Sequence, residues 1–352
     1  MEVLEIMKTT LTDMNIVSAI TSTIFIILLG FFCRKKGIFN DQVGKLLSKV
    51  VLTVALPALA FNSFMQDINR ESLAEGMNIL IWGLVIYIIL IFATKPMYMK
   101  FKEDKETTLR VLTIFGSTTF FGIPIVGAIY GAEGVLYASI FNIGYRIFLY
   151  FYAYIKMSGL KMEMKNINEM FLNPIVIATF AGLFIWITQG SLPQVAHAAT
   201  EGAASQAAFL RLDQTAIWLH KPISFLAGLA SPLAWLSIGA TLGSVKFNTA
   251  LTDRTSWIYS INKVILVPLI NIVLLAILQM TGILSMSAVC VGVVVIMMAT
   301  PTATVATAYA ISFDKDAVLA SNASLLSTIT AVVMIPVWII VLNLISSFNL
   351  FG

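Results

Sequence analysis

The chain contains few charged residues and few cysteines for its length. Charged side chains make up 11% of its 352 residues and hydrophobic ones 59%, whereas soluble domains carry about 25% charged residues. The scarcity of charge excludes an ordinary soluble protein. The apolar residues come in long continuous runs rather than in alternation, which excludes a membrane β-barrel. The sequence therefore predicts an all-α polytopic membrane protein.

The two cysteines and the start of the chain also limit its chemistry. Cys33 and Cys290 lie in or beside apolar runs that are far apart in the sequence, so neither a disulfide framework nor a metal site is expected. We expect no cofactor. The first residues, MEVLEIMKTTLTD, are acidic and lack a basic segment, so a cleaved signal peptide is not expected.

Acidic residues are missing from the interior of every apolar stretch, whereas one arginine lies in the middle of one. All eighteen Asp and Glu residues fall in loops or at the ends of apolar segments. Arg146 lies near the middle of the stretch 135–155, roughly 16 Å from either end of a helix. A cation at this depth costs about 2.5–3.5 kcal/mol on insertion scales, so it requires a negative partner or a wet cavity.

The chain offers Arg146 no acidic partner at that depth. The nearest acidic residue is Glu133, roughly 20 Å away along the same helix. We therefore expect the negative charge to come from an anionic substrate. The alternative is a structural role, in which Arg146 hydrogen-bonds carbonyls freed by a neighbouring broken helix.

Ten apolar segments are near the length of about 20 residues that a membrane-spanning helix needs. They cover residues 14–33, 45–65, 76–94, 110–130, 135–156, 170–189, 222–244, 257–280, 285–310 and 317–347.

Basic residues indicate the orientation of these spans. With the N-terminus outside, fourteen Lys and Arg residues fall in cytoplasmic loops and four in outer loops, a strong bias of the positive-inside kind. Both termini are then outside, in a plasma or inner cell membrane. Lys45, Lys49 and Lys263 lie at the cytoplasmic ends of spans, where we expect their ammonium groups to reach the interface.

The spans divide into two halves of five. Residues 1–156 form the first half, 157–169 a short cytoplasmic connection, and 170–352 the second half. An odd number of spans per half inverts the second half relative to the first, as in many secondary transporters. Landmarks recur in the same order, among them prolines in the second and seventh spans (Pro57, Pro232) and in the fourth and ninth (Pro124, Pro301).

The fourth and ninth spans carry the features of interrupted helices. Proline in a helix interior removes one hydrogen bond and costs about 3 kcal/mol or more. Corresponding interruptions in two inverted halves indicate a transport site, where the freed helix N-termini can bind an anion. The predicted substrate-binding residues are Gly122, Ile123, Pro124, Asn142, Arg146, Thr300, Pro301 and Thr302. Further lining is expected from Thr119, Ser139, Ser321 and Asn322.

Two alternatives remain open for these polar and proline residues. Proline is frequent in membrane helices, so Pro124 and Pro301 can also be structural kinks. For Asn62 and Asn271 we expect interhelical hydrogen bonds rather than substrate binding.

Three segments resemble the auxin efflux carrier family, in particular its bacterial malate permeases. They are STTFFGIPIVGAIYGAEGVLYASIFN (117–142), SPLAWLSIGATLG (231–243) and ATPTATVATAYAISFDKDAVLASNASLLSTITAVVMIPVW (299–338). The resemblance implies ten spans in a five-plus-five inverted repeat, with the fourth and ninth spans unwound and crossing at the substrate site. It also implies a scaffold of spans 1, 2, 6 and 7, a moving transport domain of spans 3–5 and 8–10, and a homodimer formed through the scaffold.

The outer segment at about 190–221 is longer than a simple turn. We interpret it as a tolerated surface insertion, the alternative being a lid or a docking element. His197 and His220 fall in or beside it and are expected to be solvated rather than catalytic.

These features favour a secondary carrier of small organic anions, with malate as the best single guess. A cation-coupled symporter or antiporter usually needs intramembrane Asp or Glu, although a Na⁺ site of carbonyls and hydroxyls stays possible. An enzyme is disfavoured because no buried His or Asp is present to activate a nucleophile. A receptor is disfavoured as well, because we identify no fused cytoplasmic domain that would relay a signal. The expected partners are the substrate, the lipid bilayer and a second copy of the chain, with no nucleic acid.

Overall fold

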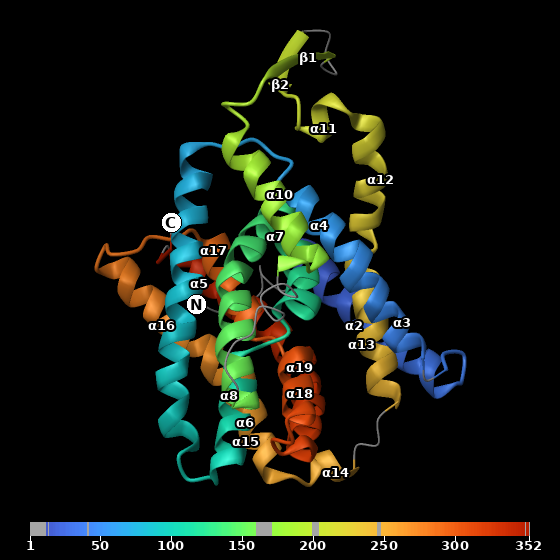
Figure 1. The fold of residues 1–352 in the computed structure, drawn as a ribbon, viewed down its shortest axis with the longest axis vertical. Helices are drawn as coiled ribbons and strands as arrows, with labels where there is room; N and C mark the ends of the chain where they lie inside the picture. Colours follow the sequence, from blue (N-terminus) through green and yellow to red (C-terminus); the bar gives the residue numbers. More distant parts are fainter. Residues whose placement is uncertain are drawn as a thin grey trace.

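The protein is a bundle of helices that run in both directions along one long axis (Figure 1). The structure, a computed structural model, describes residues 12, 14–40, 42–159, 171–198, 204–244, 248–348, 350 and 351. Most of the predicted connection at 157–169 lies outside the described residues.

The α-helices are α2 (Met14–Lys35), α3 (Val43–Val50), α4 (Leu56–Ser63), α5 (Arg70–Tyr98), α6 (Glu103–Ile114), α7 (Ile123–Phe148), α8 (Tyr154–Ser158), α10 (Pro174–Thr188), α11 (Leu212–Thr215), α12 (Ile217–Gly228), α13 (Ala230–Ser244), α14 (Asn248–Leu251), α15 (Arg254–Ile261), α16 (Val267–Met280), α17 (Ala288–Met298), α18 (Thr304–Ser312) and α19 (Ala317–Ser347). Single π-helical turns continue some of them: η1 (Val51–Ala55), η2 (Thr118–Gly122), η3 (Leu149–Ala153) and η4 (Asn262–Leu266).

Long apolar helices confirm a polytopic helical membrane protein. Among the described residues, six continuous helical segments are long and apolar enough to cross a bilayer, and two shorter apolar helices accompany them. The six are Val43–Ser63, Arg70–Tyr98, Thr118–Ser158, Ile217–Ser244, Arg254–Met280 and Ala317–Ser347. Within the third, Gly131 has φ +61°, a left-handed conformation that glycine adopts without steric cost. The helix is therefore broken where the sequence separates the fourth from the fifth span.

The helices pack in two groups. One contains α2, α3, α4, α10, α12 and α13, and the other contains α5, α6, α7 and α15 to α19. In the first group α2 and α13 approach very closely. A Cβ atom on Gly239 would lie 2.0 Å from the Ile27 carbonyl oxygen, and one on Gly30 would lie 2.4 Å from that of Leu236. Small residues allow such backbone contact between membrane helices.

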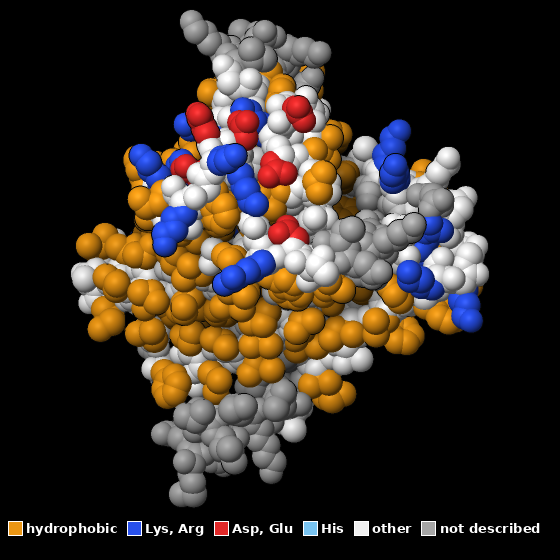
Figure 2. Space-filling view, turned by 90° about the horizontal axis from the view of Figure 1, so that it is seen from below, with side chains coloured by type: hydrophobic (Ala, Val, Ile, Leu, Met, Phe, Trp, Pro, Cys, Tyr) orange, Lys and Arg blue, Asp and Glu red, His pale blue; other side chains and the backbone are white. Residues whose placement is uncertain are grey.

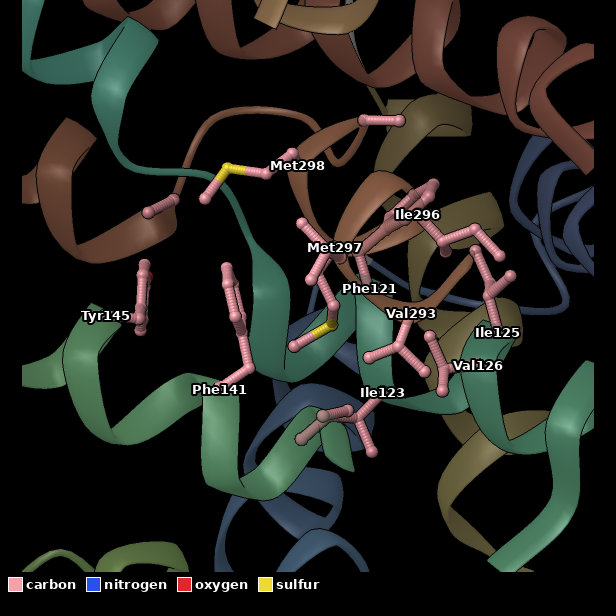
Figure 3. Packing of buried hydrophobic residues seen from close by; sticks show 14 of the residues in the cluster. Phe121, Ile123, Ile125, Val126, Phe141, Tyr145, Val293, Ile296, Met297 and Met298 are labelled. Atoms are coloured by element: carbon pink, nitrogen blue, oxygen red, sulfur yellow. The ribbon is translucent and has the colours of Figure 1, made fainter. Parts of the chain in front are cut away.

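Helix α17 lies in the centre of the second group. All of its residues from 290 to 298 are buried, as expected for a helix that is apolar on every side. Figure 3 shows Val293 and Met297 of α17 facing Phe121, Ile123 and Phe141. The core therefore joins the η2–α7 segment to a helix of the other half of the sequence.

Charged side chains gather in two places on the face that carries α14 and α15. Figure 2, which views the molecule from this end, shows Lys, Arg, Asp and Glu together in one group, Lys and Arg in a second group at the right edge, and apolar side chains over much of the remaining face. Lys315 and Asp104 form an ion pair at this end. The separation of polar and apolar surface is that of a protein surrounded by lipid.

The outer segment at 190–221 contains a β-hairpin, β1 (Gln194–Ala198) paired antiparallel with β2 (Ala204–Ala208), the small exception to the all-α prediction. Arg211 attaches the segment to the helices. Its guanidinium is 2.9 Å from Asp213, 2.8 Å from Asp67 and 2.6 Å from Gln189. Burial opposes its charge, but the hydrogen bonds to Asp213 and Asp67 outweigh this effect and raise the pKa of Arg211. The hairpin therefore has a fixed attachment to the ends of α4 and α10.

Two predicted structural amides are confirmed, and one histidine prediction is corrected. Asn271 accepts a hydrogen bond from the Trp82 indole at 3.1 Å, and Asn62 hydrogen-bonds His220. His220 is half-buried between α12 and α4 rather than solvated, because Asn62 supplies a polar partner inside the bundle. The side chain of His197 lies outside the described residues.

Candidate functional site: two interrupted helices and the hollows beside them

Two helices are interrupted in the middle of the protein, and their interruptions pair with each other. Helix α6 ends at Ile114 and η2 begins at Thr118, while α17 ends at Met298 and α18 begins at Thr304. Gly116 and Thr302 form an antiparallel β-bridge. The Ser117 amide donates to the Pro301 carbonyl at 2.7 Å, and the Ala303 amide donates to the Phe115 carbonyl at 3.0 Å.

The pairing accounts for how a broken backbone is tolerated inside the bundle. Groups freed at helix ends must find partners away from lipid, and here each interruption supplies partners for the other. Gly116 is required by the close contact, since a Cβ atom there would lie 2.3 Å from Thr300 Oγ1. Pro301 has no amide hydrogen and cannot continue α17. The interruption predicted at Pro301 is thus present in the structure.

The interruption predicted at Gly122–Pro124 lies earlier in the chain, at residues 115–117. Gly122, Ile123 and Pro124 are buried inside a continuous helical segment. Pro124 falls directly after the π-turn η2, near the start of α7, and a local π-helical adjustment lets a membrane helix accommodate a proline. Gly122 instead lets α17 approach, because a Cβ atom there would lie 2.6 Å from Met297 Sδ. These three residues therefore pack the core instead of forming the break.

Arg146 lies on the wall of a hollow next to the crossing. The hollow holds about 570 Å³ and is lined by Leu52, Ser117, Thr119, Phe120, Tyr145, Arg146, Leu149, Tyr150, Asn173, Ile175, Ala303, Thr304 and Val305. Arg146 Nη2 donates to Thr119 Oγ1 at 3.4 Å, and Asn142 Nδ2 donates to the same oxygen at 3.4 Å. In the part of the chain that the structure describes, no carboxylate forms an ion pair with Arg146.

The polar face of α7 keeps unused hydrogen-bonding capacity. Ser139, Asn142 and Arg146 follow one another at spacings of three and four residues, which places them on one face of the helix. Among the residues that the structure describes, the buried Asn142 Oδ1 and Ser139 Oγ atoms have no hydrogen-bond partner. Ser139 and Arg146 also line a second hollow of about 440 Å³ between α7 and α10. Buried polar atoms usually have partners, so this face is suited to binding a polar ligand.

A larger hollow lies on another side of the crossing and is rich in hydroxyl groups. It holds about 880 Å³ and is lined by Ser48, Ser117, Phe120, Phe121, Ile238, Thr241, Leu242, Pro301, Thr302, Thr304, Ser321, Ser324, Leu325 and Thr328. None of these lining residues is charged. The hollow shares Ser117, Phe120 and Thr304 with the hollow of Arg146, so both contact the paired interruptions.

The remaining predicted site residues lie in different places around the crossing. Thr300 is buried and its hydroxyl donates to the Met297 carbonyl at 2.7 Å. Thr302 is buried and hydrogen-bonds Ser327 and Tyr259. Pro301 and Ser321 line the hydroxyl-rich hollow, and Asn322 follows Ser321 on α19. Arg146, Asn142 and Thr119 form a separate group.

Lys263 is a residue of the crossing that the sequence analysis missed. It has no exposed surface, and its ammonium group donates to the Thr113 carbonyl at 3.0 Å. The prediction that it reaches the membrane interface is wrong, because η4 directs it toward α6. Tyr259, one turn earlier, also points inward. The signal available in the sequence was this pair of polar residues four apart, which lie on one face of a largely apolar span.

Comparison with protein families assigns the chain. A family model described as membrane transport protein matches residues 15–173 and 158–339. The chain belongs to this family. The resemblance to auxin efflux carriers is thereby confirmed, and the protein is a membrane transporter rather than an enzyme.

Relatives within the membrane transport protein family are named as transporters. An uncharacterized transporter of Methanothermobacter thermautotrophicus is 23% identical over 94% of this chain and 99% of its own length. One of Methanocaldococcus jannaschii is 24% identical over 34% of this chain and 40% of its own length. The uncharacterized transporter YfdV of Escherichia coli is 31% identical over 31% of this chain and 35% of its own length.

Proposed function

We propose that the protein is a secondary carrier of small organic anions, with malate or a related carboxylate as the first substrate to test. Its ten spans would form two inverted repeats of five, in which the fourth (α6 with η2 and the start of α7) and ninth (α17 with α18) cross. The observation that carries the proposal is Arg146, which has no carboxylate partner among the described residues and lies on the wall of a hollow that contacts this crossing.

The electrostatics of the crossing support an anionic substrate. Each helix N-terminus carries roughly half a positive charge, and two such ends, at Thr118 and Thr304, point toward the paired interruptions. The Arg146 guanidinium offers a planar set of donors that matches a carboxylate. Thr119 accepts hydrogen bonds from both Arg146 and Asn142, and its own hydroxyl hydrogen would donate to the bound anion.

The two packing groups suggest the moving parts. The group of α2, α3, α4, α10, α12 and α13 corresponds to spans 1, 2, 6 and 7, which we propose as scaffold. The other group contains both interruptions and Arg146, and we propose it as the transport domain. The hydroxyl-rich hollow lies between the groups, since Ser48 and Thr241 come from one and Thr302 and Ser321 from the other. Relative movement of the groups would expose it to each side in turn.

Three further expectations belong to this proposal. The bias of basic residues places both termini on the outer side of a plasma or inner membrane. A homodimer would form through the scaffold helices. No metal or nucleic acid takes part in the proposed transport.

A cation-coupled symporter or antiporter is the second candidate. The hydroxyl-rich hollow favours it, because hydroxyl and carbonyl oxygens are ligands for Na⁺ or other hard cations. The position of Lys263 disfavours it, because a fixed cation already lies beside the interruption of α6.

Counterflow of labelled carboxylates, amino acids and cations into proteoliposomes tests the proposal. We expect carboxylate uptake to fall at least about 30-fold in Arg146→Ala, since losing one partner of a buried charged contact costs 2–5 kcal/mol. Arg146→Lys keeps the charge but not the planar donors, so a smaller loss is expected. Arg254→Ala, which changes an exposed arginine at the start of α15, is the matched control.

Two results would count against the proposal. Unchanged carboxylate uptake in Arg146→Ala would remove Arg146 from the site. Uptake that requires Na⁺ in the parent protein would favour the cation-coupled carrier.

A further inference from the structure

Lys263 and Tyr259 together cover the C-terminal end of α6. The Tyr259 hydroxyl donates to the Leu112 carbonyl at 3.0 Å, and Lys263 Nζ donates to the Thr113 carbonyl at 3.0 Å. Both side chains are fully buried. Leu112 and Thr113 belong to the last turn of the helix, whose carbonyls have no partner within the helix itself.

The ammonium group lies directly beside the paired interruptions. A Cβ atom placed on Gly116 would lie 3.0 Å from Lys263 Nζ and 2.3 Å from Thr300 Oγ1. The amino group and the threonine hydroxyl therefore flank the same glycine. Thr300 in turn binds the Met297 carbonyl at the end of α17, so this side of the crossing collects oxygens from the C-terminal ends of both interrupted helices.

Such a cluster of oxygen atoms can coordinate a cation. A helix C-terminus carries roughly half a negative charge, and unwound carbonyls with hydroxyls coordinate Na⁺ in transporters with broken helices. In the described part of the chain no carboxylate forms an ion pair with Lys263. The partial charges of the α6 end therefore supply the stabilisation that a buried ammonium needs.

We propose that the Lys263 ammonium is a tethered cation that occupies the cation position of the crossing, so that the carrier works without Na⁺. The statement that the protein is a carrier rests on the proposed function. The occupation of the cation position by Lys263 does not depend on which substrate is transported. Replacing Lys263 by a small residue should create a site for a small free cation. Replacing it by a neutral side chain of similar length should fill the space and create no such site.

Melting of the purified full-length protein in detergent tests the position without any substrate. Parent, Lys263→Ala, Lys263→Ser and Lys263→Met are compared in Na⁺, in methylammonium and in choline at equal ionic strength. Choline is too large for the position and is the control. We expect the parent to melt at the same temperature in all three salts.

The variants should separate charge from packing. Lys263→Ala and Lys263→Ser should melt below the parent in choline. Na⁺ or methylammonium should raise their melting temperature saturably by about 2–4 °C, because a ligand that binds only the folded state stabilises it. Lys263→Met should melt below the parent and not respond to cations. Lys263→Ser also offers a hydroxyl ligand, and it replaces Lys263→Ala in this test if the alanine variant does not fold.

Three results would overturn the inference: a saturable response of the parent to Na⁺, no response of either small variant to any cation, or Lys263→Met as stable as the parent. Counterflow is measured in parallel. If Arg146→Ala keeps full carboxylate uptake while Lys263→Ala still binds cations, the proposed function fails and the tethered cation stands. The reverse pattern of results would reject the tethered cation alone.

Discussion

Arg146 and Lys263 are both cations inside the bundle, yet their surroundings differ. Arg146 lies on the wall of a hollow and donates a long hydrogen bond of 3.4 Å to Thr119. Lys263 has no exposed surface and donates to a helix-end carbonyl at 3.0 Å. One cation is thus available to a ligand, and the other is already partnered by the backbone. The comparison teaches that two cations inside one bundle can differ in whether the backbone already supplies their partner.

After the loss expected for Arg146→Ala, the next largest effect is expected where the two interruptions meet. Gly116→Ala places a methyl group 2.3 Å from Thr300 Oγ1 and 3.0 Å from Lys263 Nζ. Overpacking of this kind costs about 1–3 kcal/mol, and here it also separates the paired backbones. We expect a lower melting temperature and at least about tenfold less uptake, since 1.4 kcal/mol is tenfold. Gly190→Ala, with no atom within 4 Å of its added methyl, should leave both unchanged.

Two buried asparagines extend the comparison to amides. Asn271→Ala leaves the Trp82 indole without its acceptor, so we expect a loss of about 1–3 kcal/mol in stability, seen as a lower melting temperature. Asn142 donates a long hydrogen bond to Thr119, and among the described residues its Oδ1 has no partner, so Asn142→Ala should lower the melting temperature less than Asn271→Ala does. It should also weaken carboxylate uptake about fivefold, from a net hydrogen bond of roughly 1 kcal/mol. Equal thermal losses in both variants would remove the distinction.

Chemical labelling compares the two positions directly. In a background of Cys33→Ala and Cys290→Ala, Arg146→Cys should react with a small charged methanethiosulfonate reagent, because position 146 borders a hollow. Lys263→Cys should react much more slowly, because position 263 is fully buried. Similar labelling rates at the two positions would show that water reaches both.

The smallest effect on transport is expected at the outer hairpin. Arg211→Ala removes the contacts to Asp67, Asp213 and Gln189, so the hairpin should be cleaved faster by added protease. Because Arg211 lies outside the crossing, counterflow should stay within about twofold of the parent. A large loss of uptake would instead support the lid role left open for this segment.

The amino-acid sequence was sufficient for the class, for the family and for several individual positions. Low charge and long apolar runs identify a polytopic helical protein whatever the packing, because lipid imposes them. The break at Pro301 was also predictable, since proline cannot continue a helix. Asn271 and Asn62 were recognisable as interhelical amides because a buried amide in an apolar helix needs a partner.

Other parts of the site required the packed structure. The fourth span breaks at residues 115–117 because their backbone pairs with residues 301–303 of a distant segment. Neither Phe115 nor Ser117 is a residue type from which this pairing could be predicted. Pro124 was predicted from the sequence as part of the break, but it lies in the first turn of α7. The pairing of the two breaks, rather than the proline itself, places the crossing.

By itself the sequence determined which segments are apolar enough to cross a membrane, because transfer from water to hydrocarbon depends on side-chain chemistry alone. Only the tertiary structure decided which way each of their residues faces. Lipid and protein interior are equally apolar, so the inward and outward faces of a membrane helix have nearly the same composition. For that reason Lys263 could be read as reaching toward water, whereas the packing of η4 against α6 buries it beside Gly116.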